Sequence, residues 1–264
     1  MKTINISVLH QMKSSGEKIA CLTAYDASFA TLLEDAGVDV LLVGDSLGMV
    51  FQGQTSTLPV TIDAMVYHTT CVARGVQRAL LIADLPFLSY TSPDRALDNA
   101  GRLMAAGAGM IKLEGGLRIV ETVRRLGQWG IPVCAHLGLL PQSVHKLGGY
   151  RVQGRDPDQA TEILDHAKAL EEAGSELLVL ECIPVPLAKR ITTELKIPTI
   201  GIGAGIYCDG QILVLYDMLG ITPGKRPRFS RDFIPGNNSI RESVATFVSE
   251  VKAGTFPQLE HSYT

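Results

Sequence analysis

The chain of 264 residues has the usual length of one α/β barrel and can bury a sizeable core without disulfides or a structural metal. Hydrophobic residues make up 46% and charged residues 19% of the sequence, a globular composition that excludes extensive disorder. The formal net charge is only −3, and Lys and Arg are spread along the chain, which argues against nucleic-acid binding.

The cysteines and the apolar segments exclude further classes of protein. The five cysteines are scattered without a C-x-x-C pair, so the sequence predicts neither a disulfide framework nor a zinc site and fits a reducing cytosol. The first residues, MKTINISVLHQ, lack a basic region leading into an apolar one. No apolar run approaches the roughly 18–20 residues that span a bilayer. We therefore expect a cytoplasmic protein without a membrane partner.

Eight short apolar runs recur along the chain and alternate with segments of helical periodicity. Near-continuous apolar runs are what a parallel sheet covered on both faces requires. The predicted strands are residues 18–23, 38–45, 79–84, 109–115, 131–136, 176–181, 197–205 and 211–217.

Helix start and stop signals separate the predicted strands. The clearest helices run from Asp26 to Gly37, from Ser92 to Gly107 and from Asp156 to Gly174. One helix precedes the first strand and another, 239–254, follows the last. The order predicts an α/β fold with one domain over 1–264, a (β/α)8 TIM barrel with an extra N-terminal helix. A doubly wound sheet would need a Gly-rich turn after its first strand, and KIACLTAYD has no glycine.

Polar residues stand where the predicted strands end, and in a barrel these ends converge on one mouth. Several carboxylates facing one another would repel, and a divalent cation relieves that repulsion. Oxygen ligands favour Mg²⁺ over Zn²⁺. The residues at the strand ends are Asp26, Asp45, Ser46, Asp84, Lys112, Glu114, His136, Glu181 and the GIGAG turn at 201–205.

These side chains suit a 2-oxo acid. Its carboxylate and keto oxygens can chelate Mg²⁺, which makes the neighbouring C–H acidic. Since Mg²⁺ typically takes one or two protein carboxylates, another acid is left to act as general base, and Glu181 lies across the barrel from the others. Lys112 and Glu114 are two residues apart on one strand, so both face the same side and the lysine can hold a substrate carboxylate.

Simpler interpretations stand beside these. Asp26 is most simply a helix N-cap, and Asp45 is compatible with the same role. His136 is equally compatible with a buried core histidine. The GIGAG turn fits phosphate binding, but also close packing or contact with a flat ligand. The basic stretch KRPRF at 225–229 is most simply a solvated loop or a subunit contact.

The longest irregular stretches are 48–59 and 142–156. Both follow predicted strands, so we expect them over the mouth of the barrel, where they can serve as lids. His68 and His145 are expected at the surface or in loops.

A series of motifs in order resembles the ketopantoate hydroxymethyltransferase family over essentially the whole chain. The motifs are TAYD (23–26), VGDSLGM (43–49), TLPVT (57–61), ADLPF (83–87), KLEGG (112–116), HLGLLPQ (136–142), GGYRVQGR (148–155), LECIPVPLAKRIT (180–192), GIGAG (201–205), CDGQILV (208–214) and EHSYT (260–264).

The resemblance implies a barrel of the phosphoenolpyruvate mutase/isocitrate lyase type. It also implies transfer of a hydroxymethyl group from 5,10-methylenetetrahydrofolate to 3-methyl-2-oxobutanoate, giving 2-dehydropantoate in pantothenate biosynthesis through a Mg-stabilised enolate. Family members are cytoplasmic homo-oligomers, commonly decamers, and the same is expected here.

The resemblance also implies roles for individual residues. Asp45 and Asp84 bind Mg²⁺, with Glu114 contributing directly or through water, and Glu181 is the proton acceptor. The sequence departs from a common bacterial version at Ala135 and Leu140, where Gly and Thr are expected. The substrate contacts implied are Asp45, Ser46, Asp84, Lys112 and His136.

Two alternatives stay open. A lyase or mutase of the same superfamily would break a C–C or P–C bond of another 2-oxo acid, but the cysteine that many such lyases carry on a mobile loop is absent from both long mouth loops. A non-catalytic barrel that binds a metabolite would give no reason for the ring of carboxylates. Recognition of folate rests on the resemblance alone.

Overall fold

Eight parallel strands form one closed barrel and pair in chain order, so the predicted TIM barrel is confirmed. The computed structural model describes residues 3–222, 224 and 226–264. The strands are β1 (Ile19–Thr23), β2 (Val40–Val43), β3 (Leu80–Asp84), β4 (Met110–Glu114), β5 (Val133–Gly138), β6 (Leu177–Glu181), β7 (Thr199–Ile202) and β8 (Gly210–Leu213).

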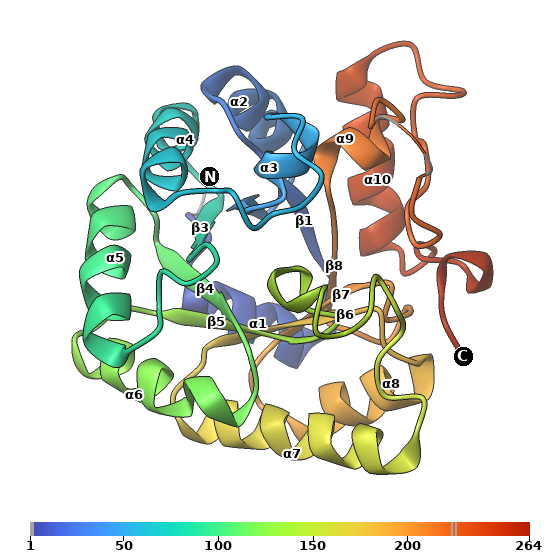
Figure 1. Ribbon diagram of the computed structural model, residues 1–264. Coiled ribbons are helices and arrows are strands. Elements are labelled where there is room, and N and C mark those ends of the chain that lie inside the picture. The colour runs from blue at the N-terminus through green and yellow to red at the C-terminus, as the bar shows by residue number, and fades with distance from the viewer. Residues whose placement is uncertain (1–2, 223, 225) are drawn as a thin grey trace.

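The helices after the first strand surround the barrel and follow one another around it in chain order (Figure 1). In the described part of the chain, none of them is long and apolar enough to cross a membrane. The α-helices are α1 (Ile6–Ser15), α2 (Ala27–Asp35), α3 (Leu47–Val50), α4 (Ile62–Gly75), α5 (Pro93–Ala105), α6 (Val120–Gln128), α7 (Pro157–Glu172), α8 (Val185–Glu194), α9 (Leu215–Met218) and α10 (Ile240–Lys252). Short 3₁₀ turns are η1 (Leu117–Ile119), η2 (Pro141–Ser143) and η3 (Leu259–His261).

Side-chain caps start the helices where the sequence predicted them. The Asp26 carboxylate accepts a hydrogen bond from the Phe29 N–H, which confirms Asp26 as the N-cap of α2. Ser92, Asp156 and Ser239 cap α5, α7 and α10 in the same way. Each cap satisfies a backbone donor that the first helical turn leaves unpaired.

The eighth strand is shorter than predicted. The sequence predicted a strand over 211–217, but β8 ends at Leu213 and the chain turns into α9. The Leu215 N–H donates to Thr23 Oγ1 at 2.9 Å, and the Asp217 N–H donates to Val214 O at 3.0 Å. These bonds satisfy the backbone N–H groups of Leu215 and Asp217 without a neighbouring strand, so the apolar run continues as a helical turn.

The inward faces of the strands change from apolar to polar along the barrel axis. On β4, Met110 packs in the apolar interior, whereas Lys112 and Glu114 on the same face line the cavity at the mouth. On β6, Val179 and Glu181 both line that cavity, with the acid at the end of the strand. The barrel core therefore forms an apolar floor beneath a layer of charged side chains.

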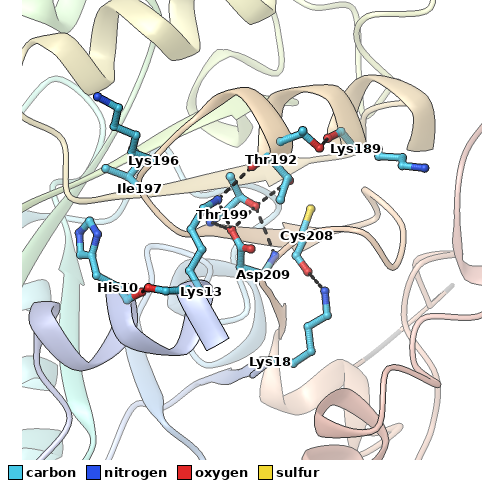
Figure 2. A network of polar contacts seen from close by, with 12 residues as sticks. His10, Lys13, Lys18, Lys189, Thr192, Lys196, Ile197, Thr199, Cys208 and Asp209 are labelled. Carbon is cyan, nitrogen blue, oxygen red and sulfur yellow. Dashed lines mark hydrogen bonds and ion pairs between the residues drawn. The ribbon is translucent and has the colours of Figure 1, made fainter. Parts of the chain in front are cut away.

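Helix α1 closes the opposite end of the barrel, where Leu9 and Met12 pack into the interior. Figure 2 shows the polar contacts that hold this helix in place. Lys13 Nζ donates to Asp209 Oδ2 at 2.8 Å, and the same oxygen accepts from the Thr199 N–H at 2.8 Å. The network joins α1 to the starts of β7 and β8, away from the charged layer.

Candidate active site

The structure brings the seven predicted site residues around one cavity of about 550 Å³ at the carboxyl ends of the strands. Five of the seven lie on β3 to β6, where strand periodicity turns them inward above the apolar interior, and the other two, Asp45 and Ser46, come shortly after the end of β2. The seven residues are Asp45, Ser46, Asp84, Lys112, Glu114, His136 and Glu181.

Lys112 and Asp84 form a buried ion pair between neighbouring strands. They are register partners on β4 and β3, and Lys112 Nζ donates to Asp84 Oδ1 at 2.8 Å. Burial alone would lower the pKa of Lys112, but the surrounding carboxylates of Asp84, Glu114 and Asp45 raise it above its ordinary value. Lys112 is therefore an ammonium group that partly offsets the acids.

Asp45 lies next to Asp84, and the negative charge of Asp84 disfavours the charged form of Asp45. The Asp45 N–H donates to Asp84 Oδ2 at 3.1 Å. Burial and the nearby charges of Asp84 and Glu114 raise the pKa of Asp45 well above its usual range. The Asp45 carboxylate accepts from Gln142 Nε2 at 2.8 Å and does not cap α3, whose N-cap is Ser46.

His136 bridges two carboxylates across the cavity. Its Nδ1 lies 3.3 Å from Glu114 Oε1, and its Nε2 lies 3.3 Å from Glu181 Oε2. In the described part of the chain neither ring nitrogen has a well-aligned hydrogen-bond partner, so these are ion-pair contacts. Burial and Lys112 lower the pKa of His136, but Glu114 and Glu181 outweigh them and raise it to about 9. His136 is thus an imidazolium facing the cavity, not a neutral core histidine.

Gln142 is a site residue that sequence reasoning missed. It lies on η2, just after β5, and its backbone N–H donates to Glu114 Oε2 at 3.2 Å. Its side chain contacts Asp45, as described above. Burial raises the pKa of Glu114, but His136, Lys112 and this backbone bond outweigh it and hold the pKa below the usual value. The HLGLLPQ motif ended on this residue, but no periodicity pointed to it.

Ser46 is held by a hydrogen bond from a neighbouring strand end. Tyr25 OH and Ser46 Oγ lie 2.9 Å apart, and the Tyr25 carbonyl lies 2.7 Å from His68 Nδ1. His68 is therefore buried, and the prediction that it lies at the surface or in a loop is wrong. Helix α4 turns it inward, and its contact with Tyr25 supports the residue that holds Ser46. Its ring also lies edge-on to the exposed rings of Phe51 and Tyr67.

The donor set fits a hard cation that shares its coordination with a substrate. Asp45 Oδ1 accepts no hydrogen bond from any residue that the structure describes. Within those residues, no group of three or more His, Cys, Asp or Glu side chains is arranged so that it could hold a metal ion. Mg²⁺ usually takes one or two carboxylates and completes its shell with water and substrate oxygens, which matches two adjacent acids at the floor of an open cavity.

Loops form the outer wall of the cavity. Tyr150 from the loop after β5 contacts Met49 Sδ through its hydroxyl group at 3.6 Å, so the two predicted lid segments meet. At 225–229, where a solvated loop or a subunit contact was predicted, Arg226 to Phe229 lie in an irregular segment and line the cavity; Lys225 lies outside the described residues. Tyr263, near the C-terminus, lines it too. None of these positions carries a periodic signal in the sequence.

The GIGAG turn packs closely against its surroundings. A Cβ at Gly205 would lie 2.6 Å from Val185, and one at Gly203 would lie 3.0 Å from Tyr263. Gly203 also has a φ of 63°, which favours glycine and ends β7 at Ile202. Close packing therefore accounts for these two glycines.

Comparisons with known proteins agree with this geometry. The family model described as ketopantoate hydroxymethyltransferase matches residues 3–259. A 3-methyl-2-oxobutanoate hydroxymethyltransferase from Shewanella piezotolerans is 58% identical over 264 residues, with 100% of both chains covered.

The solved structure of 2,3-dimethylmalate lyase, a PEP mutase/isocitrate lyase superfamily member, has a TM-score of 0.59 at 16% identity, covering 96% of this chain and 98% of that one. Phosphonopyruvate hydrolase complexed with oxalate and Mg²⁺ has a TM-score of 0.61 at 14% identity, covering 97% and 92%. The chain thus shares its barrel fold with these solved structures.

Proposed function

This chain belongs to the ketopantoate hydroxymethyltransferase family and is a hydroxymethyltransferase, and we propose that it transfers a hydroxymethyl group from 5,10-methylenetetrahydrofolate to 3-methyl-2-oxobutanoate. The product is 2-dehydropantoate, an intermediate in pantothenate biosynthesis. By its family it acts in the cytoplasm as a homo-oligomer, commonly a decamer, in which each chain is a single barrel domain. The observation that supports this function most is the division of the cavity floor, with Asp45 and Asp84 on one side and Glu181 beside His136 on the other.

Asp45 and Asp84 would hold Mg²⁺, and Glu114 would contribute directly or through water. When bound, the ion supplies Lewis-acid polarisation of the keto group, which makes the C3 hydrogen of the oxo acid acidic. The raised pKa of Asp45, caused by burial and by the neighbouring acids, supports a cation at this position.

Lys112 and Ser46 orient the oxo acid. The Lys112 ammonium is buried at the floor and is the natural partner of the substrate carboxylate, while Asp84 keeps it charged and in place. Ser46 presents a hydroxyl group that is positioned by Tyr25. His136 contacts the substrate from the opposite wall. Fixed groups of this kind hold the C3 hydrogen near the base without reorganisation during the reaction.

Glu181 accepts the C3 proton as general base. The electron pair of the broken C–H bond forms the enolate. Water hydrolyses the methylene unit of the donor: its two C–N bonds break, the two protons of the water go to the nitrogens of the departing tetrahydrofolate, and the one-carbon unit is released as formaldehyde. C3 of the enolate attacks the carbonyl carbon of formaldehyde, and the alkoxide takes up a proton to give the hydroxymethyl group. The His136 imidazolium lies 3.3 Å from the Glu181 carboxylate and holds it at the cavity wall.

An omission assay tests this function. Purified protein is supplied with Mg²⁺, 3-methyl-2-oxobutanoate and 5,10-methylenetetrahydrofolate, and each is left out in turn. We expect 2-dehydropantoate only when all three are present, and exchange of the C3 hydrogen alone when the donor is left out. Cleavage of a C–C bond of an oxo acid without the donor would favour the lyase or mutase alternative instead.

A further inference from the structure

The cavity is larger than the oxo acid requires. Its volume is about 550 Å³, a size that accommodates drug-sized ligands. The charged residues that would handle the oxo acid all lie on the floor. The cavity is also lined by Asp217 on α9, by Arg226 to Phe229 and by Tyr150 to Val152 in the loop after β5, and this part of its wall is called the second arm here. Nothing in the reaction of the oxo acid uses this arm.

Three arginines belong to the lining of this arm. Arg151, Arg226 and Arg228 are exposed and line the cavity. Arg151 pairs with no carboxylate in the described part of the chain, and Arg226 reaches Asp232 only at 3.9 Å. The Arg228 guanidinium lies 5.5 Å from the centre of the Tyr263 ring. Arginines that line a cavity without close acidic partners are suited to bind carboxylates of a ligand.

A carboxylate that the chemistry leaves unused lies deeper in the same arm. Asp217 on α9 is only 6% exposed and lines the cavity. Its Oδ1 accepts from Thr222 Oγ1 at 2.6 Å, whereas Oδ2 accepts from none of the described residues. Burial raises the pKa of Asp217. This second oxygen is not fully enclosed by protein, so a ligand in the cavity can donate N–H groups to it.

We propose, on the basis of the function proposed above, that this arm is the donor site. Asp217 accepts hydrogen bonds from the aminopyrimidine edge of the reduced pterin. Arg151 and Arg228 bind the glutamate carboxylates at the other end of the donor. Such a donor has N–H groups at one end, carboxylates at the other, and the one-carbon unit between them. The buried acid and the exposed arginines match this polarity. With its pterin end inside and its tail at the surface, the donor enters the cavity that holds the oxo acid.

Kinetics of single variants test the proposal. Asp217→Asn keeps an acceptor for Thr222, and Arg151→Gln and Arg228→Gln remove one charge each. Each variant should raise the KM for the donor by about 10-fold or more, the loss expected for a charged hydrogen bond. The KM for the oxo acid and the donor-free exchange of its C3 hydrogen should stay within about 2-fold, because the floor is untouched. Arg155→Gln is the matched control, since Arg155 is an exposed arginine of the same loop that does not line the cavity.

Inhibition by two fragments separates the two ends of the site. p-Aminobenzoylglutamate should inhibit Arg151→Gln and Arg228→Gln more weakly than the wild type, and 6-methyltetrahydropterin should inhibit Asp217→Asn more weakly. An unchanged KM for the donor in all three variants, or an equal change in Arg155→Gln, would overturn the proposal. If the wild type itself shows no donor-dependent product, the proposed function fails, which is a separate result.

Discussion

The side-chain amide of Gln142 donates a hydrogen bond of 2.8 Å to Asp45 Oδ2, while its backbone N–H donates to Glu114 Oε2 at 3.2 Å. A single residue after β5 therefore joins an acid that follows β2 to an acid at the end of β4. Tyr90 OH donates to Gln142 Oε1 at 2.5 Å, which fixes the orientation of the amide. Gln142 thus positions two of the three carboxylates assigned here to Mg²⁺.

Replacing Gln142 by Met should weaken Mg²⁺ binding. The variant keeps the length of the side chain but removes the donor to Asp45, and residues that orient metal ligands typically contribute about 10–100-fold in affinity. Calorimetric titration of Mg²⁺ in the presence of 3-methyl-2-oxobutanoate measures the change. Tyr90→Phe is the graded control and should cost less, since it leaves the amide in place. Wild-type Mg²⁺ affinity in a folded Gln142→Met protein would show that Gln142 has no positioning role.

His136 should make the stability of the Mg²⁺-free protein depend on pH. Burial lowers the pKa of His136, but the nearby carboxylates of Glu114 and Glu181 outweigh this effect and raise the pKa from 6.5 to about 9. The extra stability of the protonated form is fully present below the unfolded pKa of 6.5 and is lost as the pH rises through about 9. Its magnitude is on the order of 3 kcal/mol.

Denaturant unfolding of the wild type and of His136→Gln across this range measures the effect. The stability of the wild type should fall relative to that of the variant as the pH rises. Parallel pH profiles of the two proteins would contradict the imidazolium assignment.

Lys13→Met should lower stability without altering catalysis. Lys13 donates to Asp209 and to the Thr192 carbonyl from the helix that closes the base of the barrel, so its loss leaves a largely buried carboxylate without its cation (Figure 2). We expect a loss of about 1–3 kcal/mol in the free energy of unfolding and an unchanged kcat. The control Lys168→Met removes a partly exposed pair with Glu194, and such pairs contribute little. Equal losses in both variants would count against a special role for the network at the base.

The fold and the floor of the site were predictable because both follow from periodicity. Near-continuous apolar runs predicted the strands, and the alternation of side chains along a strand carried Asp84, Lys112, Glu114 and Glu181 to the inward face near the strand ends. A barrel then brings these ends together whatever their separation in sequence. The structure adds the contacts between them, above all the bridge that His136 makes.

The outer part of the site was not predictable, because loops have no period. Gln142, Arg228 and Tyr263 reach the cavity through irregular segments whose path depends on tertiary packing. Asp217 was misplaced for a related reason: its apolar neighbours resembled a strand, but Thr23 satisfies the backbone at Leu215 and the chain turns into α9. An apolar run of this length is compatible with either structure.

The measurement that most directly tests the central claim is exchange of the C3 hydrogen of 3-methyl-2-oxobutanoate in D₂O with Mg²⁺, without the donor, for the wild type and for Glu181→Gln. Glutamine preserves the shape of the side chain but cannot accept the proton. The wild type should exchange the hydrogen, whereas Glu181→Gln should bind Mg²⁺ and the oxo acid with near wild-type affinity and lose exchange by at least about 100-fold, as expected for removal of a general base. Undiminished exchange in Glu181→Gln would contradict the assignment of Glu181 as the base.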